Sequence, residues 1–462
     1  MRSRIKIDFE AWTCYTFVAC MRAGKNGKVR THAAAGINEL IMNAKNAQRD
    51  LVDAKMAAEL LGIKRQTLYA YVSRGLIRAC PSTSAGSKMY LRQDLEQLQL
   101  NGRAWRGRQV GLIRNGATLP TSITSIDEQG PSYRGKAAID LARMCRPFED
   151  CVELLWTGVL PSRSIEWAAP YMPRAFGSVV EAFSNSDDPP STRQVLAVIT
   201  AAYAARIGRS PETSLGGSQL AARQLLQVLA ASVGLLCKQS PEICFDIGKM
   251  SIASLIARGA SISSTQEYTD AINACLILSA DHELAPSTYA ARVVASGGAD
   301  IFACVTSGFG TFEGPLNGLG CDEPEFLLRS ATSASHYISL LKERMKRKEP
   351  PIGYNHPSYP GGDPRARFLI ALSKSVAKPS GASKITLECI EAAEKEFGLK
   401  PSLALGLVMV AASLRMPPEM PGAVMAIGRA SGWIAHVFEQ RTAGDIARPR
   451  TRYIGPQAEI SS

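Results

Sequence analysis

From Thr118 onward, the chain is a succession of helical patterns separated by short joints rich in glycine and proline. Apolar residues recur three to four positions apart, the spacing of a buried helix face, over Gln219 to Cys237, Tyr268 to Leu278, Glu325 to Arg347, Ile385 to Phe397 and Pro418 to Gln440. The joints, such as SPETSLGG, GTFEGPLNGLG and YPGGDPR, mark places where helices should end. We find no convincing strand alternation and no fixed repeat. The pattern therefore predicts an all-α fold for this part of the chain.

The length and composition of the chain restrict its class. Its 462 residues favour more than one domain, because single cores usually stop growing at about 250 to 300 residues. The longest apolar stretch, Leu403 to Leu414, is too short to cross a bilayer, and residues 1 to 23 lack a signal-peptide pattern. Its eleven cysteines include no C-x-x-C pair, which suits a reducing compartment. We expect a cytoplasmic protein with no membrane partner, no bound cofactor and no metal.

Positive charge is concentrated at one end of the chain. Residues 1 to 115 contain 20 Lys and Arg against 8 Asp and Glu, so they hold the whole net charge of +12. The remaining residues contain 33 side chains of each sign. This asymmetry predicts a small module that binds a polyanion, joined to a larger and electrically balanced module with a different partner.

The basic end contains a helix-turn-helix pattern at residues 51 to 100. It follows residues 1 to 50, which show no sustained period and are expected to be poorly ordered. A short helix is predicted over Met56 to Leu61, a break at Gly62, and a second helix over Lys64 to Arg74. The predicted buried seam consists of apolar residues from both helices: Ala57, Leu60, Leu61, Ile63, Leu68 and Tyr71.

The module resembles the winged helix-turn-helix of the MerR type. In SKMYLRQDLEQL, a turn with Lys88, Tyr90 and Arg92 precedes a predicted helix over Asp94 to Leu98. The second helix would then enter a major groove of DNA. The candidate DNA contacts are Lys64, Arg65, Gln66, Tyr69, Lys88 and Arg92, with arginines of the basic linker 101–118 as further phosphate contacts: Arg103, Arg106, Arg108 and Arg114. The alternative is a small helical adaptor used for subunit packing.

Histidine is rare in the chain, and two of the five histidines lie in unusual contexts. His282 is in SADHELAPST at a predicted helix end, and His356 is in the loop GYNHPSYPGGDPRAR, nine residues before Arg365. A histidine can donate a hydrogen bond to a carbonyl group while a guanidinium group binds a carboxylate through two parallel hydrogen bonds. These residues predict a site for a dicarboxylate or a keto acid. The alternative is two surface histidines and an arginine that caps a helix.

Seven segments, in order, resemble those of the citrate synthase family: SYRGKAAIDLA, FEDCVELLWTG, ADHELAPSTYAARV, FEGPLNGLG, GYNHPSYPGGDPRA, MAIGRASGWIAHVFEQ and IARPRTRYIGP. With the module in front, the chain is similar to a bacterial branch of that family that carries an N-terminal helix-turn-helix. The resemblance implies a citrate synthase-like domain over residues 119–458 that forms a homodimer. It further implies a large and a small helical domain, the small one at roughly 260–370, which close over oxaloacetate and then receive acetyl-CoA as co-substrate.

The resemblance also assigns roles to individual residues. His282 and His356 match the family's keto-acid histidines, and Arg365 and Arg429 match arginines that bind the carboxylates. Arg448, in IARPR, matches an arginine supplied by the partner subunit. A neutral histidine in this place can hydrogen-bond the ketone oxygen as negative charge develops on it.

Two positions depart from the family pattern. Where the family's G-P-L-H-G turn has a catalytic histidine, this chain has Asn317, and the position of the family's catalytic aspartate falls on Ala404. An amide cannot exchange a proton at neutral pH, and a methyl group cannot act as a base. Condensation of acetyl-CoA with oxaloacetate to citrate, which opens the tricarboxylic acid cycle, is therefore expected to be weakened or altered. Glu313, Asp322 or Asp281 could replace the base only by reaching the thioester methyl group from another direction.

Three functions remain open at this point. The first is an acyltransferase of the citrate synthase type with low or altered activity. The second is a non-catalytic DNA-binding regulator that senses a keto acid. The third is a partner subunit that forms heterodimers with an active synthase. Binding of acetyl-CoA remains an expectation from the family resemblance. The loop Pro357 to Gly362 has no Lys or Arg, so the sequence does not identify contacts for the CoA phosphates.

Overall fold

The computed structural model describes residues 51–61, 64–73, 77, 79–81, 88–91, 95, 119–172, 176, 191–207, 215–314 and 320–447. The chain divides into two compact units, Met1–Arg108 and Gln109–Ser462, and each is described by itself. The segment 1–50 and the linker 101–118 lie outside the described residues, and their state stays a prediction.

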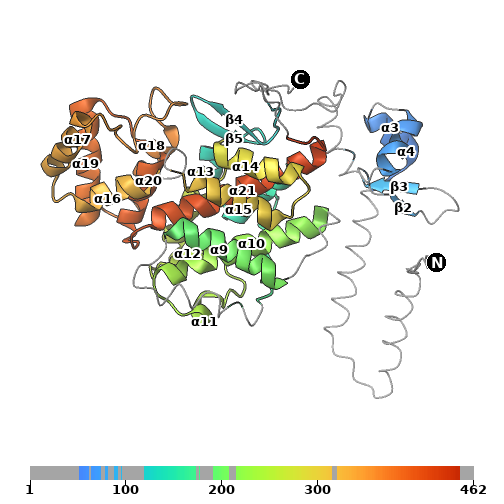
Figure 1. Cartoon of the computed structure of the whole chain (residues 1–462), viewed down its shortest axis with the longest axis horizontal. Coiled ribbons are helices and arrows are strands. Elements are labelled where there is room, and N and C mark those ends of the chain that lie inside the picture. Colours follow the sequence, from blue (N-terminus) through green and yellow to red (C-terminus); the bar gives the residue numbers. More distant parts are fainter. Residues whose placement is uncertain are drawn as a thin grey trace, which may run out of the picture. The chain divides into compact units, whose positions relative to one another are not determined.

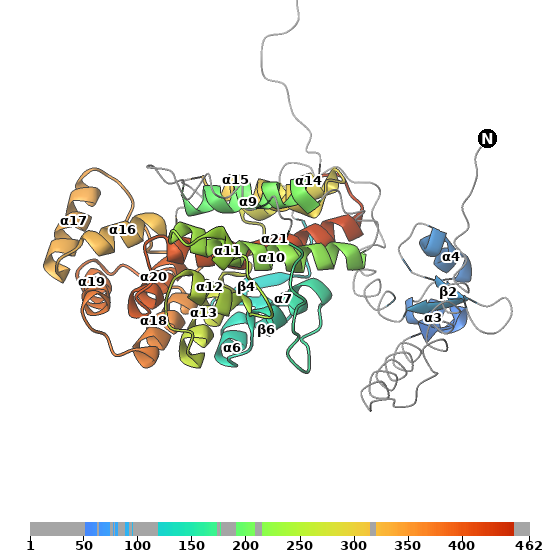
Figure 2. The same cartoon turned by 90° about the horizontal axis from the view of Figure 1, so that it is seen from below.

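The first unit contains the predicted pair of helices (Figure 2). Helix α3 (Ala54–Leu61) is capped by the preceding residue, Asp53, whose Oδ1 accepts hydrogen bonds from the backbone N of Lys55 and Met56 at 2.9 and 2.8 Å. Helix α4 (Arg65–Ser73) follows. Both helices begin and end within two residues of the predicted bounds.

A three-stranded antiparallel sheet completes the described part of the first unit. Strand β3 (Lys88–Leu91) lies between β1 (Leu51–Val52) and β2 (Ala79–Pro81), so β2 and β3 form a hairpin where the wing was predicted. The core of this unit consists of Val52, Ala57, Leu68, Ile77, Tyr90 and Leu95, with Leu60 and Leu61 packed against it. Ile63 and the side chain of Tyr71 lie outside the described residues.

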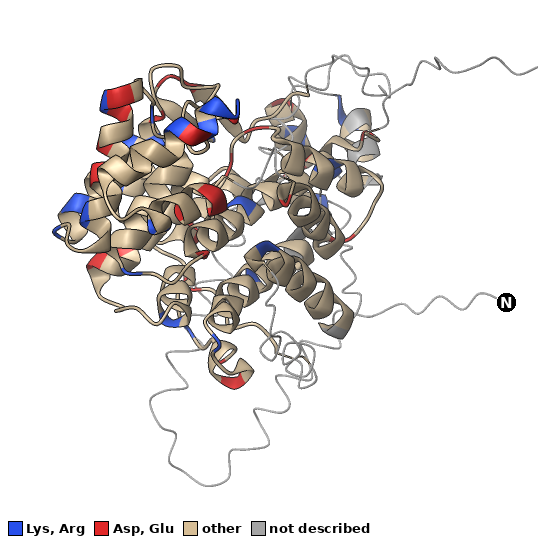
Figure 3. Ribbon diagram, turned by 60° about the vertical axis from the view of Figure 1, so that its left-hand side comes forward, with Lys and Arg blue, Asp and Glu red and all other residues tan. Residues whose placement is uncertain are grey.

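The second unit is built mainly from helices, as predicted (Figure 1). They are α6 (Ala138–Arg143), α7 (Phe148–Thr157), α9 (Thr192–Ile207), α10 (Leu215–Leu236), α11 (Pro241–Cys244), α12 (Ile252–Gly259), α13 (Gln266–Ser279), α14 (Pro286–Ser296), α15 (Ile301–Phe312), α16 (Asp322–Ser330), α17 (Ala334–Lys346), α18 (Pro364–Val376), α19 (Ala382–Phe397), α20 (Leu403–Ser413) and α21 (Met420–Ala443). Charges of both signs are interspersed over these helices, in keeping with the balanced composition (Figure 3).

Two details of the sequence prediction are wrong. The stretch Glu325 to Arg347 forms two helices, because Ala331 is extended and the Ser333 hydroxyl accepts a hydrogen bond from His336 N at the start of α17. The region after Thr118 also contains an antiparallel sheet of β4 (Thr124–Asp127), β5 (Gly130–Tyr133) and β6 (Lys136–Ala137). These strands are too short to show a clear alternation in the sequence.

Helix α21 runs through the main core of the second unit, packed against α13, α14 and α15 (Figure 1). Its glycines permit a close approach to α13. A Cβ atom on Gly428 would lie 2.8 Å from the carbonyl oxygen of Leu276, and a Cβ atom on Gly432 would overlap the carbonyl oxygen of Ala280. This contact places α21 directly beside the C-terminal end of α13, where His282 follows.

A second, smaller core is formed by α16, α17, α19 and α20 (Figure 1). Its buried members run from Leu328 to Met409, which overlaps only partly with the range 260–370 predicted for the small domain. Helices α13, α14 and most of α15 contribute to the main core instead.

One segment of the described residues, Gly217–Leu236 in α10, is long and apolar enough to cross a membrane. The sequence-based prediction named only Leu403 to Leu414, which forms the shorter α20. In the fold, 72% of the apolar window of α10 is buried inside the protein, as in other core helices.

Candidate keto-acid site

Two loops bring His282 and His356 together. The centroids of the two imidazole rings lie 4.9 Å apart, and the rings are inclined at 71°. His282 directly follows the end of α13, whereas the loop of His356 is held by Asn355, which exchanges hydrogen bonds with the backbone of Lys400 at 2.7 and 2.9 Å. Glu283 and Asn355, the neighbours of the two histidines, have φ angles of 54° and 55°, so both loops turn sharply at the site.

Both histidines are neutral at pH 7. Burial and the guanidinium groups of Arg365 and Arg429 lower the pKa of His282 far below its ordinary value. Burial and Arg365 also lower the pKa of His356, although Asp363 opposes them. His356 Nδ1 accepts a hydrogen bond from Ser358 N at 3.2 Å, so the proton of the neutral ring lies on Nε2, which can donate to a ligand.

Arg365, at the start of α18, is held by a buried carboxylate. Asp363 Oδ1 accepts from Arg365 Nε at 3.0 Å, and Oδ2 accepts from Nη2 at 2.8 Å. Burial opposes the charge of Arg365, but Asp363 more than offsets this effect and raises the pKa of the guanidinium group. Within the described residues, Nη1 of Arg365 has no hydrogen-bond partner, so this end of the guanidinium group can bind a carboxylate.

Arg429, on α21, is buried close by. Its Nε donates to the carbonyl oxygen of Ser279 at 2.8 Å, at the end of α13. Burial lowers its pKa, whereas the carboxylate of Asp281 raises it. The guanidinium groups of Arg365 and Arg429 are near enough to lower the pKa of both histidines, so the four predicted residues share one electrostatic environment.

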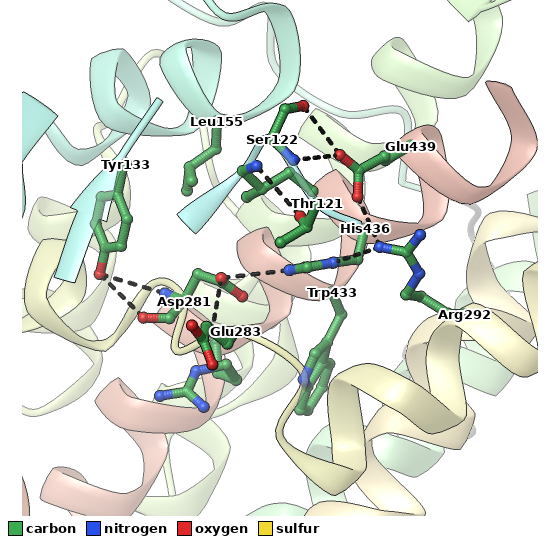
Figure 4. A network of polar contacts seen from close by, with 12 residues as sticks. Thr121, Ser122, Tyr133, Leu155, Asp281, Glu283, Arg292, Trp433, His436 and Glu439 are labelled. Carbon is green, nitrogen blue, oxygen red and sulfur yellow. Dashed lines mark hydrogen bonds and ion pairs between the residues drawn. The ribbon is translucent and has the colours of Figure 1, made fainter. Parts of the chain in front are cut away.

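Asp281, which directly precedes His282 in the chain, belongs to a buried polar network (Figure 4). Its Oδ2 lies 3.3 Å from His436 Nε2, and His436 Nδ1 lies 2.9 Å from Arg292 Nη1. Because a guanidinium group can only donate, Nδ1 accepts, and Nε2 of a neutral ring carries the proton toward Asp281. Burial raises the pKa of Asp281, but His436 and Arg429 lower it further, to a net value below the ordinary one.

The same network continues to the first strand region of this unit (Figure 4). Arg292 Nη1 donates to Glu439 Oε2 at 2.7 Å, and Glu439 Oε1 accepts from the backbone N and the hydroxyl of Ser122 at 2.8 and 2.9 Å. The Tyr133 hydroxyl lies 3.3 Å from both backbone N and O of Asp281. These bonds hold the backbone that precedes His282 in one position.

Ala404, to which the family resemblance assigns the place of the catalytic aspartate, lies in an apolar environment. Ala404, in the first turn of α20, is buried, and a Cβ atom on Gly320 would lie 3.9 Å from its Cβ and from Met425 Sδ. Gly320 lies three residues after Asn317, which is outside the described residues. Gly320 is therefore close to Ala404, whose methyl side chain offers no carboxylate.

The three acidic side chains considered as replacement bases already have partners. Asp281 contacts His436 as described, Asp322 forms an ion pair with Arg193, and Glu313 Oε1 accepts from the Ser191 hydroxyl at 3.3 Å. Each carboxylate therefore has at least one oxygen engaged, while Oδ1 of Asp281 is buried without a hydrogen-bond partner among the described residues.

The remaining predicted site residues divide into two groups. In the first unit, Lys64, Arg65, Gln66, Tyr69 and Lys88 are exposed, as a nucleic-acid interface requires. Arg92 and Arg448 lie outside the described residues, so their roles stay predictions.

The part of the chain that the structure describes holds no group of three His, Cys, Asp or Glu side chains suited to a metal ion.

Sequence reasoning missed the side chains that hold the predicted residues in place. Asp363 and Tyr359 lie in the same loop motif as His356 and Arg365, so this motif was a usable signal. His436 lies in the segment that supplied Arg429, seven residues further along α21, two helical turns away and therefore on the same face.

Comparison with known proteins identifies the family of the chain. The family model described as "Citrate synthase, C-terminal domain" matches residues 111–450, and the model described as "Helix-turn-helix domain" matches residues 51–103. The chain therefore belongs to the citrate synthase family, as the sequence predicted.

Curated relatives include citrate synthases and 2-methylcitrate synthases. Citrate synthase 2 of Bacillus subtilis is 33% identical over 195 residues, which is 41% of this chain and 52% of that protein. The match thus spans about half the length of this relative. Citrate/2-methylcitrate synthase of the same organism is 28% identical over 357 residues, 74% of this chain and 95% of that protein.

Solved structures show the same fold. Citrate synthase of Thermoplasma acidophilum, solved in a ternary complex with carboxymethyl coenzyme A and oxaloacetate, is 21% identical with a TM-score of 0.66, over 76% of this chain and 97% of that one. Citrate synthase of Thermotoga maritima is 20% identical with a TM-score of 0.60, over 76% and 97%. At this identity the likeness establishes the fold.

Proposed function

We propose that this chain binds a small keto dicarboxylate such as oxaloacetate at His282, His356, Arg365 and Arg429. The observation that carries the proposal is the convergence of two neutral histidines on two buried guanidinium groups. Cations bind the carboxylates, and a neutral imidazole N–H donates to the ketone oxygen. The fold and family membership support the same ligand class.

The charge of the site supports a homodimer. Within one subunit, the buried cations Arg365 and Arg429 face the buried carboxylates Asp363 and Asp281, so these four charges cancel. A dicarboxylate would add two negative charges to a neutral environment, which is costly without another cation. The family resemblance implies that Arg448 of the partner subunit reaches this site, and Arg448 would supply that cation. We expect this dimer to work in the cytoplasm.

We propose further that condensation with acetyl-CoA is slow. Ala404 offers no base for the thioester methyl group, and Asn317 can donate a hydrogen bond but cannot transfer a proton. Loss of a general base typically costs about 10² to 10⁴ in rate. The protein is thus an acyltransferase of the citrate synthase type with its keto-acid site kept and its proton transfer weakened.

Titration calorimetry tests the binding. Oxaloacetate should bind the wild type, and Arg429→Lys should weaken binding at least about tenfold, because Lys lacks the planar pair of donors. Arg143→Lys, at an exposed ion pair with Asp140, is the matched control and should leave the affinity unchanged. Absence of binding by oxaloacetate and citrate to the wild type would refute the proposal.

Release of free CoA from acetyl-CoA and oxaloacetate tests the chemistry. The wild type should be slow, and the double variant Asn317→His, Ala404→Asp should be faster by at least about 10², since it restores both proton-handling groups. Full turnover by the wild type, equal to that of the double variant, would contradict the proposed loss of proton transfer.

A second candidate function, a DNA-binding regulator, is favoured by the exposed face of α4. Lys64, Arg65, Gln66 and Tyr69 are all exposed along or just before this helix. Fluorescence anisotropy with DNA from upstream of the coding sequence should show binding that weakens with salt. Arg65→Ala should reduce the salt slope by about one, whereas Arg143→Ala should not. Failure to bind any duplex at low salt would eliminate this function.

The third possibility is that the chain is a partner subunit of an active synthase, and purification of the protein from its own cells tests it. Co-purification with a second synthase chain would favour it, and a homodimer isolated from cells would exclude it.

A further inference from the structure

Tyr359 contacts three of the four residues of the candidate keto-acid site: His282, His356 and Arg365. Its hydroxyl oxygen lies 3.1 Å from His282 Nε2, and its ring centroid lies 5.1 Å from that of His356. The guanidinium carbon of Arg365 lies 5.2 Å from the centroid of the same ring. Tyr359 is itself 2% exposed, so these contacts are made in a nearly dry environment.

The hydroxyl of Tyr359 keeps its proton at neutral pH. Burial raises the pKa of this side chain to about 12, although Arg365 opposes the shift. The partner ring of His282 is neutral, because its pKa is far below the ordinary value. The bond therefore joins two neutral groups, and it fixes which ring nitrogen of His282 faces the tyrosine.

The ring of Tyr359 acts on Arg365 in a different way. A cation over the face of an aromatic ring is attracted to it, and more strongly where water is excluded. Asp363 already holds Nε and Nη2 of Arg365, so the aromatic face and the carboxylate together restrict the plane of the guanidinium group.

The backbone of Tyr359 is fixed by two turns. Its N donates to the carbonyl oxygen of His356 at 2.9 Å, and its carbonyl oxygen accepts from Gly362 N at 2.9 Å. Gly362 has a φ of 103°, which a residue with a side chain rarely adopts. The hydroxyl therefore reaches His282 from a rigid loop that belongs to the other half of the site.

We propose that Tyr359 is a positioning residue of this site, which sets the ring orientation and proton position of His282 through its hydroxyl and the plane of Arg365 through its ring. This inference rests on the proposed keto-acid site. It predicts that the hydroxyl governs recognition of the ketone oxygen, while the ring governs recognition of the carboxylate.

Two variants separate these roles. Tyr359→Phe removes only the hydroxyl and should weaken oxaloacetate binding about tenfold, which corresponds to about 1.4 kcal/mol. Succinate, which has two carboxylates and no ketone, should lose less than about threefold. Tyr359→Leu also removes the ring and should weaken both ligands. Tyr203→Phe, which deletes a hydroxyl bonded to the carbonyl oxygen of Tyr171 at 3.1 Å, is the matched control.

A spectroscopic measurement keeps the test independent of ligand binding. In ¹⁵N NMR of the histidine rings, Tyr359→Phe should shift the Nε2 resonance of His282, and Tyr203→Phe should not. Equal loss of oxaloacetate and succinate in Tyr359→Phe, or an unchanged His282 spectrum, would overturn the positioning role. Failure of the wild type to bind oxaloacetate while the His282 signal responds would refute the ligand and leave the contact established.

Discussion

Asp363 holds Arg365 by two parallel hydrogen bonds, from Nε at 3.0 Å and from Nη2 at 2.8 Å. The same carboxylate accepts from the backbone N of Arg365 and of Leu403, both at 3.0 Å. One side chain thus caps α18, joins it to the start of α20 and fixes the guanidinium group of Arg365. The pair is almost completely buried, with side-chain exposures of 0% for Asp363 and 2% for Arg365.

We predict that Asp363→Asn destabilises the protein by about 3 to 5 kcal/mol, because it leaves the buried guanidinium group without a counter-charge. The asparagine oxygen can still cap the helix, so the change isolates the ion pair. Urea unfolding measures the loss. Glu391→Gln, which breaks the exposed pair with Lys374 at 3.1 Å, should cost no more than about 1 kcal/mol. Similar losses in the two variants would contradict the prediction.

A second prediction concerns glycines in two helices. Gly432→Ala on α21 should destabilise by at least about 2 kcal/mol, because the new methyl group would overlap the carbonyl oxygen of Ala280 and lie 2.6 Å from Asp281 Oδ1. Gly310→Ala on α15, where nothing lies within 4 Å, should stabilise by up to about 1 kcal/mol. Thermal unfolding of both variants checks the opposite signs. A stable Gly432→Ala protein would show that α21 can move away from α13.

The histidines predict a pH dependence of stability. Their pKa values are lowered in the fold, so below about pH 6.5 these imidazoles bind protons in the unfolded chain but stay neutral in the folded protein. The unfolded state then binds more protons, and stability falls as the pH falls. His282→Gln should reduce this slope by up to about 1.4 kcal/mol per pH unit between roughly pH 6 and 5.

Urea unfolding at several pH values measures that slope for the wild type and the variant. Between about pH 7.5 and 8.5 an imidazole changes charge in neither state, so the two proteins should show parallel curves there. Parallel curves between pH 6 and 5 as well would show that His282 is protonated in the fold.

Restoring the family carboxylate alone should carry a stability cost. Ala404→Asp buries a carboxyl group beside Met425 and should destabilise by about 1 to 3 kcal/mol. Ala371→Asp, at an exposed position of α18, should change stability by less than about 1 kcal/mol. Differential scanning calorimetry on both variants makes the comparison, and equal melting temperatures would mean that the site around Ala404 is already hydrated.

The sequence predicted the helices and named candidate site residues, but it did not predict the contacts between them. His282, His356, Arg365 and Arg429 could be named because they lie in recognisable motifs. The bond from Tyr359 to His282 joins residues 77 positions apart, and no local spacing encodes such a contact.

The break within the predicted long helix and the short strands were harder to predict from local sequence patterns. Ser333 ends the predicted long helix because its hydroxyl bonds to His336 N, yet the apolar period continues on both sides of it. The short sheet β4–β6 depends on pairing between strands of two to four residues, which leaves too few positions for an alternation to stand out.

The two glycine contacts of α21 have a consequence for the size of the ligand. Arg429 directly follows Gly428, and the close backbone contact with α13 leaves α21 little room to shift relative to α13. The position of its guanidinium group is therefore set by main-chain packing. In the proposed site this fixed guanidinium group would set the distance between the two bound carboxylates, so a dicarboxylate that is one methylene shorter or longer should bind more weakly than oxaloacetate.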